Sequence, residues 1–184
     1  PLFLCAGVLP WIFFSGALTE ATGSIVGNSN LVLKVHFPLE ILPLSYCFSI
    51  LFDFVFSLIA LLPILYALGV HIDVLVLIHL LPIIVIHLFF IIGLSLFLSV
   101  AHVFYKDVGH LLSIVLMFWF YLTPIFYSID HLPVEIQNVY AWNPMVYFVQ
   151  GYRNILFLNT PPTVQLYMQM IIISLVTFCA GWAF

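Results

Sequence analysis

Residues 74–101 read VLVLIHLLPIIVIHLFFIIGLSLFLSVA and contain no Asp, Glu, Lys or Arg. A helix that spans a lipid bilayer needs about 20 consecutive apolar residues. Strands of a membrane barrel are shorter and alternate apolar with polar residues, and this stretch does neither. The stretch therefore predicts one membrane-spanning α-helix.

Further runs of the same kind flank this one, at residues 1–19, 41–70, 111–128 and 166–184. Apolar residues make up 65% of the chain and charged residues 5%, whereas soluble domains carry about 45–50% and about 25%. Because so few charges cannot cover a water-facing surface, the apolar side chains must face lipid. The sequence predicts an all-α, polytopic transmembrane helical bundle of about five spans, in a single domain of residues 1–184.

The few basic residues indicate how the bundle sits in the membrane. Lys and Arg concentrate in short cytoplasmic loops. Lys34 lies in the first loop and Lys106 in the third, and five spans place those two loops on the same side. We assign that side to the cytoplasm, which leaves Arg153 outside.

The segment between the last two spans, residues 129–165, is expected outside. Its first part, residues 132–142, predicts a short amphipathic helix with Pro133 in its first turn, which Asn143-Pro144 ends. The apolar residues 145–158 that follow are too few to cross the bilayer. A helix that dips into the membrane and returns explains residues 133–158 best. An interfacial hairpin is the alternative.

Asp53 lies near the middle of the second span, where a carboxylate costs about 2.5–3.5 kcal/mol and should face protein or water. Antiparallel packing of the second and third spans places Asp53 opposite Ile91 and about four residues, or roughly 6 Å, from His87. We expect a polar tie between Asp53 and His87. A proton relay through the same pair is the alternative.

Several classes of site find no support in the sequence. The seven histidines form no His-Glu-x-x-His pair and no Cys/His cluster with zinc spacing. Cys5, Cys47 and Cys179 are expected to be small buried hydrophobes. No glycine-rich phosphate loop occurs, so we expect no ATP site. We likewise expect no catalytic residue, no metal and no bound cofactor. A net charge of −4 without a basic run argues against nucleic acid as a partner.

Aromatic residues, 17% of the chain, are frequent on the expected outer side. Trp and Tyr form belts at membrane interfaces, and aromatic faces also stack on sugar rings. Composition does not separate these two roles. An outer gate or sugar path would be built from an outer aromatic set, Trp119, Tyr121, Tyr127, Tyr140, Trp142, Tyr147 and Tyr152.

The order of short motifs along the chain carries a family resemblance. The motifs are Leu9-Pro10-Trp11-Ile12-Phe13-Phe14, Glu20-Ala21-Thr22, the run from Gly27 to Ser45, Val103-Phe104-Tyr105-Lys106-Asp107-Val108, Leu122-Thr123-Pro124-Ile125-Phe126-Tyr127 and Asn143-Pro144-Met145. This series resembles the membrane permeases of bacterial ABC polysaccharide exporters, which move O-antigen, capsule or teichoic-acid chains. The similarity covers almost the whole chain.

The resemblance implies six spans in a full-length protein, so this chain looks like spans two to six. We therefore expect a fragment that lacks the first span and the extreme C-terminus, which agrees with a start at Pro1 and an end inside an apolar run at Phe184. The resemblance also implies a homodimer in the bacterial inner membrane. Two copies of a separate ATP-binding subunit, which holds ATP and Mg²⁺, would drive it.

The family places its contact with the ATP-binding subunit in two segments, which correspond here to residues 27–40 and 105–107. We name this set the coupling surface; it comprises Asn28, Lys34, His36, Phe37, Pro38, Glu40, Tyr105, Lys106 and Asp107. The family usually carries Arg or Lys before the Glu and before the Asp. Leu39 departs from that pattern and Lys106 keeps it.

The function implied by the resemblance is export of a polysaccharide, lipid-linked in this family, driven mechanically by ATP hydrolysis in the partner. A permease for small molecules or drugs is the alternative of the same class. A proton-coupled carrier or an integral membrane enzyme would rest on Asp53 and the histidines alone.

Overall fold

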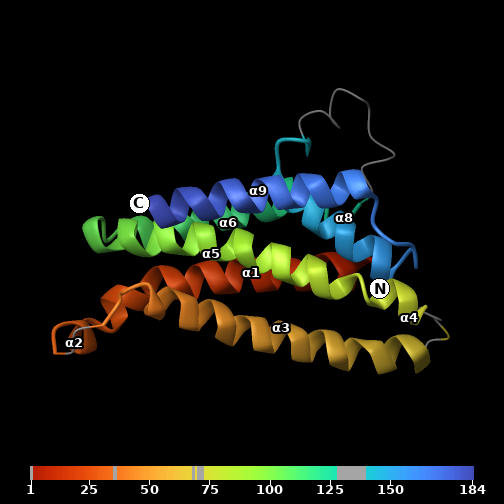
Figure 1. Cartoon of the computed structure of the whole chain (residues 1–184), viewed down its shortest axis with the longest axis horizontal. Helices are drawn as coiled ribbons and strands as arrows, with labels where there is room; N and C mark the ends of the chain where they lie inside the picture. The colour runs from red at the N-terminus through yellow and green to blue at the C-terminus, as the bar shows by residue number, and fades with distance from the viewer. Residues whose placement is uncertain (1, 35–36, 68, 70–72, 128–139) are drawn as a thin grey trace.

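A computed structural model of the protein describes residues 2–34, 37–67, 69, 73–127 and 140–184, and these are helical with short connections (Figure 1). The elements are α1 (Leu2–Gly27), α2 (Ser29–Val32), α3 (Ile41–Ala67), α4 (Val74–Leu77), α5 (Leu80–Phe104), α6 (Val108–Leu122), α8 (Pro144–Leu156) and α9 (Val164–Ala183). The predicted all-α class is confirmed. The long helices lie side by side, with α1 and α5 central, α3 packed outside α1, and α9 packed outside α5.

Among the described residues, four segments are long and apolar enough to cross a membrane: Phe3–Gly27, Ile41–Ala67, Val74–Phe104 and Val164–Ala183. The span expected at 111–128 is shorter than predicted, because α6 has only 15 residues and ends at Leu122. Pro124 disfavours helical geometry at Thr123, which is extended, with φ −96° and ψ 130°. At about 1.5 Å per residue α6 covers roughly 22 Å, less than the hydrocarbon core of about 30 Å.

The bundle has two ends, which we name by a residue at each. At the Lys106 end, α1, α5 and α9 finish while α3 and α6 begin (Figure 1). At the Asn159 end, the backbone N–H of Asp73 donates to Oδ1 of Asn159 at 2.9 Å. Nδ1 of His79 lies 3.0 Å from the Tyr167 hydroxyl at the same end. Lys34 and Lys106 thus share one end, as the sequence predicts.

Close contact between α5 and α9 depends on small residues. A Cβ atom at Gly181 would overlap the carbonyl of Gly93, and one at Gly93 would lie 2.5 Å from backbone atoms of Thr177 and Phe178. The Ser174 hydroxyl also donates to the carbonyl of Ile86 at 2.9 Å. Small side chains of this kind let membrane helices approach until their backbones touch.

An aromatic cluster fills the centre of the bundle, around the fully buried ring of His87. Phe13 and Phe14 come from α1, Phe90 from α5 and Phe148 from α8. The Phe148 ring stacks on His87 with centroids 4.4 Å apart. The cluster therefore packs α8 directly against the two central helices.

Candidate functional site

The helix α8 begins part of the way along the bundle and not at one of its ends. Asn143 is its N-cap, where Oδ1 accepts from the N–H of Met145 at 3.1 Å, and Pro144 occupies the first turn. Nearby Trp119 contacts Trp11, which lies about nine residues, or roughly 14 Å, into α1. The other end of α8 reaches the start of α1, where Arg153 lies over Phe3. This agrees with a helix that dips into the membrane.

The buried face of α8 explains why it stays at this depth. Its buried residues are Met145, Val146, Phe148, Val149, Gly151, Tyr152, Arg153, Ile155 and Leu156. Apart from Arg153 these are apolar or aromatic residues and glycine, and this face packs on α1, α5 and α9. Of the outer helix expected at 132–142, residues 132–139 lie outside the described part of the chain.

Asn143 joins the start of α8 to the end of α6. The indole N–H of Trp119 donates to Oδ1 of Asn143 at 2.8 Å. Nδ2 of Asn143 donates to the carbonyl of Leu122 and to the hydroxyl of Thr123, each at 3.1 Å. These bonds satisfy a carbonyl left open at the helix end as well as the N-terminus of α8. The Asn143-Pro144 motif, which the sequence suggested only as a helix break, is thus a junction.

Arg153 is a buried cation that binds backbone carbonyls. Its guanidinium donates to the carbonyl of Ile125 at 2.5 Å and to that of Tyr127 at 3.4 Å. It lies 3.7 Å from the centre of the Phe3 ring, a cation–π contact. Among the described residues no carboxylate pairs with it, and its Nε has no hydrogen-bond partner. From the sequence, Arg153 was expected only to mark the topology, although a lone Arg in an apolar stretch already indicates a special role.

The expected tie between Asp53 and His87 is not formed, and we correct it. Asp53 is exposed on the outer face of α3, whereas His87 is fully buried. The neighbouring Phe54 takes the inward position, stacked on Phe13 at 4.7 Å. The polar neighbour of His87 is Tyr152, whose hydroxyl lies 3.5 Å from Nδ1. The side chain at position 53 therefore points away from the helix that carries His87.

The outer aromatic set is divided by its burial. Tyr121 and Trp142 are exposed, and Trp119, Tyr127, Tyr140 and Tyr147 are half-buried. The hydroxyls of Tyr127 and Tyr140 are 2.6 Å apart. Tyr152 is fully buried in the central cluster, so in this structure it lines no open path. Its place in an outer gate or sugar path stays a prediction.

A shallow groove runs beside the start of α8, with a volume of about 420 Å³. Trp142 and Tyr147 line one side, and Gln169 and Thr177 of α9 contribute polar groups. Trp142 is 89% exposed. Two of the seven aromatic residues thus share one surface with amide and hydroxyl groups.

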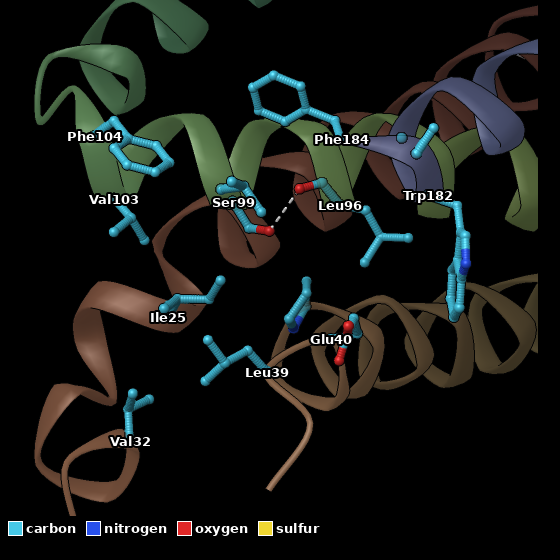
Figure 2. A pocket seen from close by; sticks show the side chains of 14 residues that line it. Ile25, Val32, Leu39, Glu40, Leu96, Ser99, Val103, Phe104, Trp182 and Phe184 are labelled. Atoms are coloured by element: carbon cyan, nitrogen blue, oxygen red, sulfur yellow. Dashed lines mark hydrogen bonds between the residues drawn. The ribbon is translucent and has the colours of Figure 1, made fainter.

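At the Lys106 end, a cavity of about 540 Å³ lies between the first segment of the coupling surface and the ends of α5 and α9 (Figure 2). Val32, Leu39 and Glu40 line it from the first segment, and Val103 and Phe104 line it from just before the second. The other lining residues are Ile25, Pro43, Leu96, Ser99, Val100, Gly181, Trp182, Ala183 and Phe184. Among the described residues that line the cavity, Glu40 is the single charged one.

The charged members of the coupling surface reach solvent. Lys34, Glu40, Lys106 and Asp107 are exposed, as are Pro38 and Tyr105, while Phe37 is half-buried. Asn28 points back into the bundle, where Nδ2 donates to the carbonyl of Ser24 at 2.8 Å and reaches the Tyr46 hydroxyl at 3.5 Å. His36 lies outside the described residues. Glu40 lies at the edge of the cavity, and the other exposed members lie on the solvent-accessible surface, where a partner can touch them.

Comparison with known proteins shows similarity to one family of membrane transporters. The model for the ABC-2 type transporter family matches residues 2–157. The O-antigen export system permease protein RfbA of Myxococcus xanthus is 31% identical over an alignment of 194 positions. The alignment covers 98% of this chain and 70% of that protein. Two proteins of the same name from Klebsiella pneumoniae are 27% identical over 158 residues, 86% of this chain and 61% of each relative. The chain thus spans between 61% and 70% of the length of these relatives.

Proposed function

The chain belongs to the ABC-2 type transporter family, and on that premise we propose that it is the permease of an exporter that moves polysaccharide across the bacterial inner membrane. The apolar helices make it a multi-pass protein of that membrane. Permeases of this family carry no ATPase domain, and a separate ATP-binding subunit provides the energy. We further propose what the cargo is, how many subunits assemble and which residues line the path of the polymer.

The cargo is proposed from the relatives. Proteins named as O-antigen export permeases align with 98% and 86% of this chain. O-antigen is a polysaccharide, so a sugar chain, lipid-linked at one end, is the cargo that these similarities favour. A homodimer with two ATP-binding subunits would surround such a polymer with matching surfaces from each protomer.

The coupling surface carries the mechanical part of the proposal. Its two segments lie at the same end of the bundle, and the first of them lines a cavity there. The loop at 27–40 connects α1 with α3, and the turn at 105–107 connects α5 with α6. A partner that moves against this end therefore acts on all four helices at once. We assign this end to the cytoplasm, where ATP is available.

Aromatic side chains near the start of α8 are proposed to form the exit for the polymer. The exposed rings of Tyr121 and Trp142 lie near the junction of α6 with α8. Aromatic faces next to amide and hydroxyl groups suit sugar rings, which present both C–H faces and hydroxyls. We propose that these exposed members of the outer aromatic set guide the polymer, while the half-buried members hold the gate in shape.

Deletion of the gene followed by complementation tests the function. We expect polysaccharide to disappear from the cell surface and accumulate inside, and the full-length protein to restore export. Drug sensitivity in the same strains is the comparison. Unchanged surface polysaccharide together with new sensitivity to small molecules would favour the drug-exporter alternative.

A further inference from the structure

We propose that Arg153 is a positioning residue that fastens α8 to the chain segment after α6, so that α6 and α8 move as one unit. The movement rests on the proposed function, but the fastening itself does not. The unit comprises α6, residues 123–127 and α8. The fastening is a property of the resting protein and is measured there.

Two attachments, far apart along α8, join it to the same stretch of chain. Asn143 binds Trp119, Leu122 and Thr123 at one end. Arg153 binds the carbonyls of Ile125 and Tyr127 at the other. Ten residues of helix separate Asn143 from Arg153, which is roughly 15 Å. The start of α8 binds residues 119–123, and its later part binds residues 125 and 127. The helix α8 therefore runs parallel to residues 119–127 and is held at both ends.

The chemistry at the second attachment requires arginine. After Pro124 the chain is no longer helical, so its carbonyls lack the partners that a helix would supply. Ile125 is fully buried, and a buried carbonyl without a donor is costly. A guanidinium presents several N–H donors in a rigid fork and can serve two carbonyls together. Lysine offers a single ammonium, and an apolar residue offers no donor.

The contacts of α8 with the other helices involve aromatic rings, including the cation–π contact of Arg153 with Phe3 of α1. Phe148 stacks on His87 and Phe90 of α5, and Tyr152 meets Phe54 of α3 edge-on. The polar contact here, from Tyr152 to His87, is long at 3.5 Å. Burial of apolar rings has little directional preference, whereas the bonds of Asn143 and the bond from Arg153 to the Ile125 carbonyl are short and directional. Motion under load is therefore expected between α8 and the α1–α5 pair, not between α8 and α6.

Distances between spin labels in the full-length protein test the proposal. Labels at Phe126 and Gln150 report inside the unit, and labels at Ile12 and Gln150 report between the unit and α1. All three positions are exposed, and labelled protomers are diluted with unlabelled ones. We expect a constant distance for the first pair and a changed distance for the second when the complex is trapped with ATP. Equal changes in both pairs, or a second pair that does not move, would overturn the moving unit.

Variants of Arg153 test the fastening in resting protein, without nucleotide or partner. Arg153→Met keeps the packing of the side-chain stem and removes the donors. We expect a broader or longer distance for the Phe126–Gln150 pair and export reduced roughly tenfold, with Arg153→Lys restoring part of both. Unchanged distances in correctly folded Arg153→Met protein would refute the fastening. Lost export with unchanged distances would leave the transport function standing and remove Arg153 from this role.

Discussion

The indole N–H of Trp119 donates a 2.8 Å hydrogen bond to Oδ1 of Asn143, which joins two segments that are 24 residues apart in the chain. The same oxygen accepts from the N–H of Met145 and so caps α8. The carboxamide of Asn143 therefore caps both the end of α6 and the start of α8. Its removal should affect both helices together.

Asn143→Ala should destabilise the protein by about 1–2 kcal/mol, because it removes a helix cap and leaves the Trp119 indole unpaired. Trp119→Phe removes the donor from the other side. We expect the two losses to be less than additive in a double-mutant cycle, measured as thermal unfolding in detergent. Strictly additive losses would mean that the two residues are not coupled.

Gly181→Ala should lower the thermal midpoint through a loss of about 1–3 kcal/mol, because the new methyl group overlaps the Gly93 carbonyl. Gly23→Ala is the matched control, since no neighbouring atom lies within 4 Å of the added Cβ. It should be neutral or mildly stabilising, as alanine favours helix. Equal effects of the two substitutions would argue against close α5–α9 contact.

Asp53→Asn and Asp53→Leu should both leave the amount of folded protein near normal, because the carboxylate is exposed and does not reach His87. The neighbouring Phe54→Ala should cost about 3–5 kcal/mol, since Phe54 is buried against Phe13. Protein levels in membranes measure both. If Asp53→Leu lowers the level as Phe54→Ala does, Asp53 has a partner in another protomer or outside the described residues.

Asp53 and Phe54 show what the sequence can and cannot predict. The thiol of Cys47 lies 3.3 Å from the Ser95 hydroxyl, so position 53 falls about level with Phe89, close to the predicted Ile91. The lengths of the spans were enough to predict that level. The rotation of α3 was not predictable, because a membrane helix is apolar on all sides and lacks the polar face that orients a soluble helix.

The candidate site divides in a similar way. The helix within residues 145–158 was predicted because it is too short to cross and is bounded by Asn143-Pro144 and Pro161-Pro162. The roles of Arg153 and Tyr152 depend on backbone carbonyls and rings from distant segments, and no local pattern indicates such partners. The exposed members of the coupling surface were placed by resemblance, and their role stays a prediction.

Tyr140→Ala combined with Trp142→Ala should reduce export about tenfold or more, because it removes a half-buried gate ring and an exposed one. Phe52→Ala combined with Phe56→Ala also removes two rings, from exposed positions on α3. We expect this control pair to leave export near normal. Surface polysaccharide per amount of permease is the measurement, and equal losses from the two pairs would reduce the outer rings to an interfacial belt.

Charge reversal at the coupling surface provides the most direct test of energy supply. Glu40→Lys and Lys106→Glu place the wrong charges at a cavity edge and at a turn, both exposed. Gln165→Lys, exposed near the Asn159 end, is the control for added charge. Like charges placed at a contact weaken it and slow its formation.

The decisive measurement is co-purification of the full-length permease with its ATP-binding subunit, followed by the ATP hydrolysis rate of the complex. We expect a stable, ATP-hydrolysing complex for the wild type and Gln165→Lys, and a several-fold loss of bound subunit and of hydrolysis for the doubly reversed variant. A doubly reversed variant that binds and hydrolyses like the wild type would contradict coupling at the Lys106 end. Failure of the wild-type permease to bind any ATP-binding subunit would contradict the proposed ATP-driven export.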